Sequence, residues 1–311
     1  MSLFKKILPF FSQKIKPLII SCRPNQWTKN LLVFAAPIFG LNLENEVLVN
    51  SFLSLICFCL ISSSVYLLND SIDIKEDRLH PLKKYRPIAS GLIKINEALF
   101  FSFLLFLISS LIAFVFSKVL FILILLYSII QFSYCLKLKN IPLLDLFCIS
   151  SGFLLRAIAG GISSNIILTQ WFLLTIVLLA FFLAVEKRKS ELIQFQNNKK
   201  MTRKVIKKYS LPLLLRMESL SANSAFISYA LWATGPLLNG ATNRWMIITV
   251  PIVLYGIFRY QLLSDPNQII LKKYGKVQLS AQNPEEILLK DKGIQITIIL
   301  WLIITLIIFK S

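Results

Sequence analysis

Residues 69–91 read NDSIDIKEDRLHPLKKYRPIASG and directly follow an apolar stretch that is long enough to cross a membrane. Asn69, Asp73 and Asp77 stand four residues apart and Asp70 lies three before Asp73, so a continuing helix places all four on one face. Carboxylates gathered in this way repel each other unless a cation lies among them. Oxygen ligands favour Mg²⁺, which keeps several waters and completes its shell with substrate phosphates. The pattern therefore predicts a magnesium and diphosphate site, with the three aspartates as catalytic residues and all four side chains as metal ligands.

Basic residues follow these carboxylates within one short loop and supply donors for phosphate oxygens. They are Arg78, Lys83, Lys84 and Arg86. An exposed charged loop would have a similar composition, but the four-residue spacing and the position after an apolar span favour the phosphate site. The single histidine, His80, lies in the same loop, where a solvated turn explains it as well as phosphate binding does.

The composition is that of a membrane protein. The 311 residues are 56% hydrophobic, and their mean hydropathy is +0.70, which exceeds the usual range of soluble domains. Apolar stretches recur along the whole chain, so we expect one all-α, polytopic membrane domain over residues 1–311, with nine transmembrane helices. The expected spans are 18–41, 50–68, 97–116, 119–136, 142–162, 168–185, 218–239, 245–263 and 293–309.

The net charge of +19 suggests nucleic-acid binding at first, but the distribution of the charge argues against it. With nine spans, thirty of the 34 Lys and Arg residues fall on one side of the membrane, when residues 18–30 at the start of the first expected span are counted with that side. This bias identifies the cytoplasmic side and places the N-terminus there. The expected cytoplasmic segments are an interfacial N-terminal segment 1–17 and the loops 69–96, 135–141, 186–216 and 259–292. The acidic cluster then faces the cytoplasm.

Other polar residues cluster at the same expected face. RPNQWTKN, residues 23–30, contributes Lys29, although Trp27 and a snorkelling lysine also fit a membrane-interface belt. Arg156 interrupts an apolar span at a cost of about 3 kcal/mol, which favours a polar cavity around it. It shares a helix face with Asp145, eleven residues earlier. Further candidates for substrate binding are Tyr134, Lys137, Lys139, Lys187, Arg188 and Glu191.

These groups suit a reaction that needs no strong base. The sequence offers no Ser-His-Asp or Cys-His arrangement, and the five cysteines lie in or beside spans as packing residues. We expect displacement of pyrophosphate from an activated carbon by an acceptor that is already anionic or electron-rich. Mg²⁺ would neutralise the leaving group, and cationic side chains would hold the second substrate, which is in part a lipid.

The acidic pattern after the second span resembles the UbiA superfamily of intramembrane prenyltransferases over nearly the whole chain. RPNQWTKN, HPLKKYRPIASG, LLRAIAGG, EKRKSEL and PEEILLKDK are most similar to its decaprenyl-phosphate phosphoribosyltransferase (5-phosphoribose-1-diphosphate synthase) branch. The resemblance implies a bacterial plasma-membrane enzyme of cell-envelope biosynthesis that transfers 5-phosphoribosyl from phosphoribosyl pyrophosphate to a polyprenyl phosphate. The four acidic-motif residues would hold Mg²⁺ and the donor diphosphate. The loop cations would bind donor phosphates, and Lys29, Lys137, Lys139, Arg156, Lys187 and Arg188 are candidates for the lipid phosphate.

Two alternatives stay open at this point. The first is an ordinary UbiA enzyme that moves a prenyl group from its diphosphate to an aromatic acceptor or quinone precursor. Such enzymes carry a second acidic motif after helix six, whereas this chain has Glu186, Lys187, Arg188 and Glu191 there. The second is a transporter, which would show inverted repeats and midplane charges beyond Arg156. The sequence predicts neither the lipid's chain length nor the oligomeric state.

Overall fold

The computed structural model describes residues 14–40, 44–198, 204–236, 240–241, 243–265, 287 and 290–310. These parts of the chain are helices, short 3₁₀ segments and turns, without a β-strand, so the all-α prediction is confirmed. The backbone groups of a helix satisfy one another along the segment, which is what a membrane core requires. The chain divides into two compact units, Met1–Ile141 with Leu155–Ile167, and Pro142–Leu154 with Leu168–Ser311. The expectation of one membrane domain stays a prediction.

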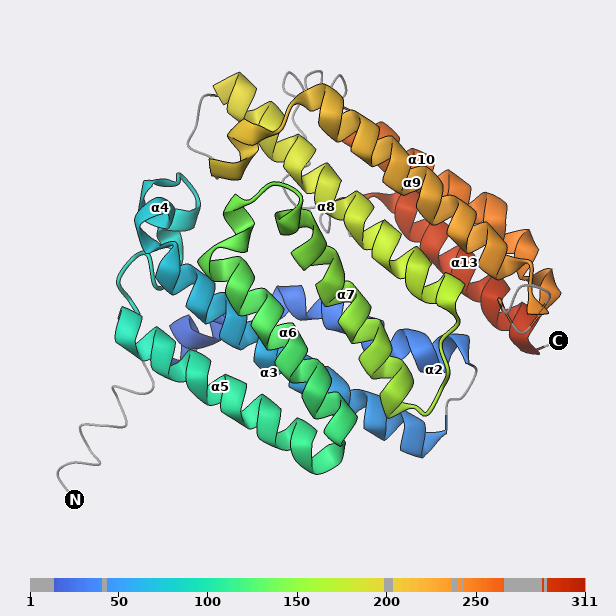
Figure 1. The fold of residues 1–311 in the computed structure, drawn as a ribbon, viewed down its shortest axis with the longest axis horizontal. Helices are drawn as coiled ribbons and strands as arrows, with labels where there is room; N and C mark the ends of the chain where they lie inside the picture. The colour runs from blue at the N-terminus through green and yellow to red at the C-terminus, as the bar shows by residue number, and fades with distance from the viewer. Residues whose placement is uncertain are drawn as a thin grey trace. The chain divides into compact units, whose positions relative to one another are not determined.

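The first unit is built around three long helices that pack on one another, α3, α5 and α6 (Figure 1). Its elements are a helical stretch 14–21, η1 (Pro24–Phe34), α2 (Ala35–Phe39), α3 (Asn45–Ile72), α4 (Ile74–Leu79), η2 (Lys83–Tyr85), α5 (Ile95–Phe116), α6 (Lys118–Leu136) and η3 (Leu138–Asn140). The last part of α7 (Leu144–Ser163) also belongs to it.

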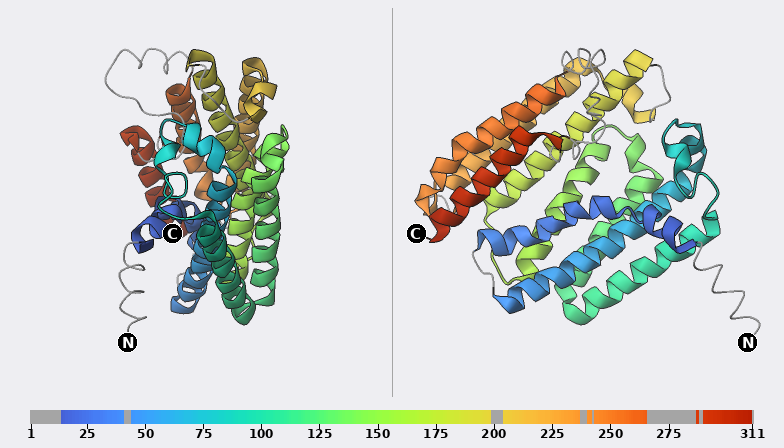
Figure 2. Two further views of the ribbon diagram at one scale, coloured as in Figure 1. Left: turned by 90° about the vertical axis from the view of Figure 1, so that its left-hand side faces the viewer. Right: turned by 180° about the vertical axis from the view of Figure 1, so that it is seen from behind.

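The second unit pairs α8 with α9 and α10 with α13, and Figure 2 shows both pairs from behind. Its elements are the first part of α7, then α8 (Gln170–Asn198), η4 (Lys204–Lys208), α9 (Leu211–Ala233), η6 (Arg244–Thr249), α10 (Val250–Ser264) and α13 (Lys292–Lys310). The helix α8 continues well beyond the expected span 168–185 and carries the charged segment after it.

The first expected span, 18–41, is not one α-helix. The chain is helical over 14–21, adopts a left-handed backbone at Arg23 (φ 54°), and continues as the 3₁₀ segment η1 and the short helix α2. The residue before a proline is disfavoured in the α conformation, and Pro24 follows Arg23 directly. The break lets η1 lie along α3, where the Trp27 indole donates to the Ser63 hydroxyl (3.1 Å).

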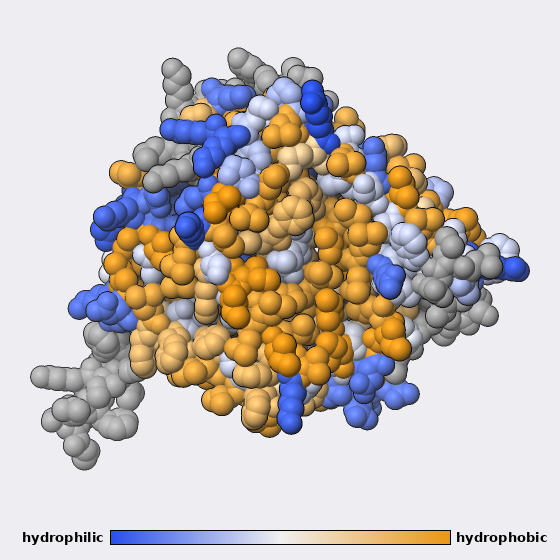
Figure 3. Space-filling model, viewed as in Figure 1, coloured by the Kyte–Doolittle hydropathy of each residue, from blue (hydrophilic) through white to orange (hydrophobic). Residues whose placement is uncertain are grey.

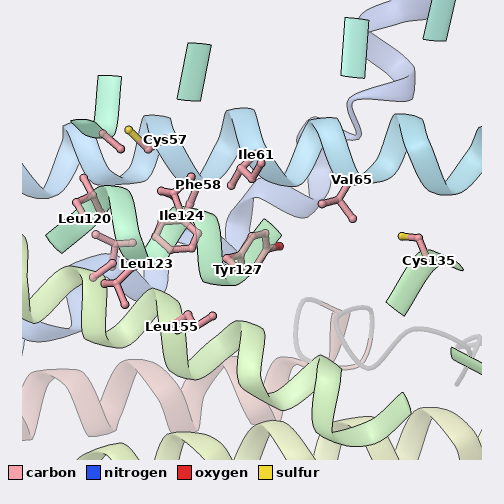
Figure 4. Close-up of a cluster of buried hydrophobic side chains, with 13 residues drawn as sticks. Cys57, Phe58, Ile61, Val65, Leu120, Leu123, Ile124, Tyr127, Cys135 and Leu155 are labelled. Atoms are coloured by element: carbon pink, nitrogen blue, oxygen red, sulfur yellow. The ribbon is translucent and has the colours of Figure 1, made fainter. Parts of the chain in front are cut away.

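Small and hydroxyl-bearing residues bring the helices of the first unit together. Ser64 of α3 and Ser102 of α5 donate to each other's backbone carbonyls at 2.7 and 2.8 Å. A Cβ on Gly160 of α7 would lie 2.1 Å from the Val33 carbonyl oxygen, so only glycine fits this approach of α7 to η1. Such contacts replace the hydrophobic driving force that is missing between helices in lipid. The adjoining core, shown in Figure 4, includes Phe58 and Tyr127.

Six described helices are long and apolar enough to cross a membrane: Asn45–Ile72, Ile95–Phe116, Lys118–Leu136, Leu144–Ser163, Gln170–Ile193 and Arg244–Ser264. A shorter apolar helix spans Lys292–Ile308. Large apolar side chains face outward along them, for example Phe100 and Val115 of α5, and apolar surface covers much of the face in Figure 3. Lipid is the environment that such a surface requires. The count of nine spans stays a prediction.

Two expected features lie largely outside the described residues. These are the interfacial segment 1–17, described from residue 14, and the loop 259–292 with its PEEILLKDK motif, described at residues 259–265, 287 and 290–292.

Candidate functional site

The acidic motif lies where α3 ends and α4 begins. Asp73 separates the two helices, yet its amide donates to the Asn69 carbonyl (2.9 Å) and its own carbonyl accepts from the Asp77 amide (2.8 Å). The i to i+4 hydrogen bonding therefore continues through the junction, as a helical face requires. Asp70 and Asp77 are buried, while Asn69 and Asp73 are partly exposed.

One guanidinium joins the two buried carboxylates. Nη1 of Arg86 donates to Asp77 Oδ2 (2.6 Å) and to Asp70 Oδ1 (3.1 Å). Arg23 donates through Nη2 to the same oxygen of Asp70, and its guanidinium lies 4.8 Å from the centre of the Tyr66 ring. Since both carboxylates contact the same nitrogen, they approach each other across Arg86. The left-handed backbone of Arg23, which is unusual for a residue with a side chain, aims its side chain at this point.

Asp73 has a different partner. The ammonium group of Lys139, in η3, donates to Asp73 Oδ1. Lys139 is 7% exposed, so most of this lysine is covered while its charge meets the carboxylate. Lys139 thus contacts the acidic motif through a carboxylate, and its expected role in binding the lipid phosphate stays a prediction. Its neighbour Lys137 is exposed.

The donor set suits a hard divalent cation, because Asn69, Asp70, Asp73 and Asp77 offer oxygen ligands within nine residues across the junction of α3 and α4. The carboxylates are held by side-chain cations. Among the described residues no three His, Cys, Asp or Glu side chains form a ready metal-binding group. The residue types and their common location fit magnesium, but binding it requires the carboxylates to leave part of their present ion pairs.

The remaining loop cations are distributed around this cluster. Arg78 donates from Nε to the Ala89 carbonyl (3.0 Å), and the Lys84 ammonium lies 5.0 Å from the centre of the Tyr85 ring. The side chains of Arg78 and Lys84 are exposed and that of Lys83 is partly exposed. The backbone amides of Leu82 and Lys83 donate to Nδ1 of His80 at 3.2 and 3.3 Å, which shapes the turn that carries these cations.

Arg156 forms a second polar centre of the first unit, inside a candidate membrane helix. Its Nε donates to Asn30 Oδ1 (2.6 Å) and its Nη2 donates to the Tyr127 hydroxyl (2.8 Å). The guanidinium also lies 5.0 Å from the Tyr127 ring centre, and Lys29 interacts electrostatically with Tyr127. Aromatic faces and neutral oxygens thus stabilise a cation that lipid alone would not tolerate. Tyr134 packs against the same hydrophobic core.

Arg188 belongs to the second unit and is completely buried. Its Nε donates to Asp145 Oδ2 (2.6 Å) and its Nη1 donates to Glu191 Oε2 (2.7 Å). Tyr209 donates its hydroxyl proton to the other oxygen of Asp145 (2.7 Å) and accepts from the Leu143 amide (2.8 Å). Burial raises the pKa of Tyr209, which keeps this donor protonated. The expected contact of Arg188 with a lipid phosphate stays a prediction, while Lys187 beside it is partly exposed.

Asp145 and Arg156, which were expected to line one polar face of α7, contact different partners. Asp145 lies in the Arg188 network and Arg156 in the Asn30 and Tyr127 network. A buried cluster follows Arg188 on α8, where the Lys189 ammonium donates to Glu186 (2.7 Å) and to Glu218. Two of the basic residues after the sixth expected span, Arg188 and Lys189, are therefore paired with carboxylates inside the unit.

Three residues of these networks had no assigned role in the sequence analysis: Tyr127, and Arg23 and Asn30 of the RPNQWTKN segment, of which only Lys29 was a substrate-binding candidate. Arg23 carries a signal that could have been used, because an arginine immediately before a proline and ahead of a tryptophan belongs to a turn. Asn30 belongs to the same RPNQWTKN segment as Lys29. Tyr127 has no such signal, since one tyrosine within an apolar helix is ordinary.

Comparison with solved structures defines the class of fold. A UbiA homologue from Archaeoglobus fulgidus, solved bound to GPP and Mg²⁺, has a TM-score of 0.68 at 18% identity and covers 95% of this chain and 100% of its own. A digeranylgeranylglyceryl phosphate synthase structure has a TM-score of 0.64 at 17% identity, with 95% and 98% coverage. The fold is therefore that of the UbiA-type helical membrane proteins.

The family follows from the sequence comparison. The model of the UbiA prenyltransferase family matches residues 31–270, and the chain belongs to this family. Decaprenyl-phosphate phosphoribosyltransferase of Mycolicibacterium smegmatis is 35% identical over 93% of this chain and 91% of its own length. The protein of the same name from Corynebacterium glutamicum is 31% identical, over 91% and 84%. Family membership and the six apolar helices together indicate an integral membrane protein.

Proposed function

We propose that the protein is a membrane transferase that moves 5-phosphoribosyl from phosphoribosyl pyrophosphate to a polyprenyl phosphate and releases pyrophosphate. The observation that carries the proposal is the 35% identity, over more than nine tenths of both chains, to a decaprenyl-phosphate phosphoribosyltransferase. The cluster of Asp70, Asp73 and Asp77 with its cations supports it, because this arrangement can bind a metal diphosphate. The site faces the cytoplasm at the end of the second of nine membrane helices.

In this reaction the bond between the anomeric carbon and the diphosphate oxygen breaks, and pyrophosphate leaves with the electron pair. An oxygen of the lipid phosphate forms the new bond to the same carbon. The acceptor is already an anion, so no side chain has to remove a proton. This agrees with the lack of a general base arrangement in the sequence.

The residues divide between the two substrates by position. Asn69, Asp70, Asp73 and Asp77 would hold Mg²⁺, which would supply charge neutralisation for the departing diphosphate. Arg86 and Arg23 lie on these carboxylates, and the exposed Arg78, Lys83 and Lys84 extend the cationic surface for the donor phosphates. Lys139 is next to Asp73 and is a candidate for the lipid phosphate, together with Lys29, Lys137, Arg156 and Lys187.

The second candidate is prenyl transfer from a prenyl diphosphate to an aromatic acceptor. The observation in its favour is the structural likeness to a homologue bound to GPP and Mg²⁺. At 18% identity this likeness supports the fold alone. The two carboxylates of α8, Glu186 and Glu191, form ion pairs with Lys189 and Arg188 of the same helix. The same two cations also bind Asp145 and Glu218. This leaves the motif around Asp73 as the acidic site for a metal diphosphate, which supports the first candidate.

The test is a direct comparison of donors. Membranes containing the full chain are incubated with labelled phosphoribosyl pyrophosphate and a polyprenyl phosphate, and with a labelled prenyl diphosphate and an aromatic acid in parallel. We expect label from the first mixture in the lipid phase. Product from the second mixture alone would reverse the assignment.

A further inference from the structure

The acidic motif is electrically balanced by the chain itself. Its three carboxylates are matched by three cationic side chains that contact them: Arg23, Arg86 and Lys139. Arg86 is central, because its Nη1 lies between Asp70 and Asp77 and contacts both. Its guanidinium therefore holds two of the carboxylates that a divalent cation would need as ligands. All of these residues belong to the first unit.

A bare divalent cation gains little from entering such a site. The net charge that it meets is close to zero, so there is no strong long-range attraction. It would also have to displace a guanidinium from Asp70 and Asp77, whose side chains are 3% and 4% exposed. A cation pushed out of a pair with buried carboxylates needs a new partner, since an uncompensated charge is costly.

A metal diphosphate meets the same site differently. The complex is a net anion, so it is attracted by the loop cations and brings oxygen acceptors with it. The Arg86 side chain is 26% exposed, which gives its guanidinium room to turn outward. It can exchange two carboxylates for diphosphate oxygens in bidentate geometry. The ligand that displaces the Arg86 guanidinium from the carboxylates thus also supplies its new hydrogen-bond acceptors.

We propose that the divalent cation enters this site together with the diphosphate and not before it, with Arg86 as the resident cation that the complex replaces. Arg86 is then a positioning residue that keeps Asp70 and Asp77 together in the free protein. It becomes a diphosphate ligand in the loaded protein. This inference rests on the proposed function for the nature of the donor.

The experiment measures metal binding by the full chain in detergent without the lipid acceptor. Mn²⁺ is the probe, and the loss of the free-ion electron paramagnetic resonance signal reports binding. Titrations are made with the metal alone, with inorganic pyrophosphate and with phosphoribosyl pyrophosphate, each against a blank without protein. We expect the wild type to bind Mn²⁺ about tenfold more tightly with either diphosphate present, which is a usual size for coupling between ligands.

The variants test Arg86 itself. Arg86→Gln is expected to bind Mn²⁺ alone about tenfold more tightly than the wild type, and to lose most of the coupling to pyrophosphate. Lys75→Gln is the matched control, because it removes one positive charge from an exposed position of the neighbouring helix α4. It should leave the affinity for metal alone within about twofold of wild type. A merely structural role of Arg86 would weaken metal binding, not strengthen it.

The results separate the two proposals. If pyrophosphate tightens Mn²⁺ binding but phosphoribosyl pyrophosphate does not, the proposed order of binding is supported and the proposed donor is contradicted. Equal Mn²⁺ affinity of the wild type with and without any diphosphate overturns the inference, whatever the donor is. The wild-type comparison decides this even if Arg86→Gln does not fold.

Discussion

Two clusters of acidic and basic residues, one in each unit, differ in how far they reach solvent. At the acidic motif, the Arg23 and Arg86 side chains are 19% and 26% exposed. In the second unit, the Arg188 and Asp145 side chains are both 0% exposed. Exposed cations can change partners when a ligand arrives, whereas buried ones are held by their carboxylates. The difference teaches that the first cluster is suited to ligand binding and the second to holding helices together.

The largest expected effect of a substitution is on catalysis at the first cluster. Asp73→Asn should lower turnover by about a thousandfold, since several kcal/mol of charge stabilisation are lost with a metal ligand. The protein should stay folded in the membrane, because the side-chain oxygen of an asparagine can still accept a hydrogen bond from the Lys139 ammonium. The measurement is the initial rate of lipid labelling, with expression checked in the same membranes. Glu76→Gln, an exposed acid of α4, is the control; wild-type turnover by Asp73→Asn would contradict a metal-diphosphate mechanism.

The second prediction concerns stability in the buried cluster. Arg188→Met leaves Asp145 buried without its cation and should lower the free energy of unfolding by about 3–5 kcal/mol. Thermal or denaturant unfolding in detergent measures this loss. Arg216→Met, which removes an exposed arginine from α9 of the same unit, should change stability by no more than about 0.5 kcal/mol. If both variants unfold alike, the Arg188 network does not have the structural role that its burial suggests.

A third prediction addresses the polar centre around Arg156. Arg156→Met should raise the KM for the lipid phosphate by about tenfold to a hundredfold, the size expected for one charge-assisted hydrogen bond. Arg156→Lys keeps the charge and should recover part of the loss. Kinetics with both substrates varied separate this effect from a change in donor affinity. A KM change confined to phosphoribosyl pyrophosphate would place Arg156 on the donor side.

The smallest expected effect is at the start of α13. Arg259 donates to Asp291 at 2.6 and 3.1 Å, and this contact lowers the pKa of the Asp291 carboxyl below its ordinary value. A depressed pKa in the folded protein means that the pair stabilises at pH values above about 4 and is lost as the pH falls further. Asp291→Asn should cost at most about 1 kcal/mol at neutral pH, and melting curves at pH 7 and at about pH 2 should show the difference shrinking, because the carboxyl is then protonated in both states. A constant difference would exclude the ion pair as its cause.

Much of the fold could be predicted from apolar runs, and part of the site from spacing. The helices α3, α5 and α6 follow stretches long enough to span a membrane. The spacing of three and four residues predicts that Asp70 and Asp77 share one face, and both contact Arg86. The break at Arg23 was missed, because hydropathy outweighed the proline that follows it.

The partners of the charged residues could not be predicted in the same way. Lys139 contacts Asp73 and Arg188 contacts Asp145 from distant parts of the chain. Helical periodicity describes one helix at a time and says nothing about which residue of another helix meets a given face. For this reason the sequence identified Arg188 as a phosphate ligand without indicating its partner Asp145, whereas Glu191 lies three residues along the same helix.

The central claim is that a diphosphate departs from the anomeric carbon at the Asp70, Asp73 and Asp77 cluster. The most direct measurement uses phosphoribosyl pyrophosphate labelled with ³²P either at the 5-phosphate or at the terminal phosphate of the diphosphate. With the full chain, polyprenyl phosphate and Mg²⁺, we expect the 5-phosphate label in the lipid and the terminal label in free pyrophosphate, with both lost on chelation of the metal. Terminal label in the lipid, or transfer that is unchanged by chelation, would contradict the account.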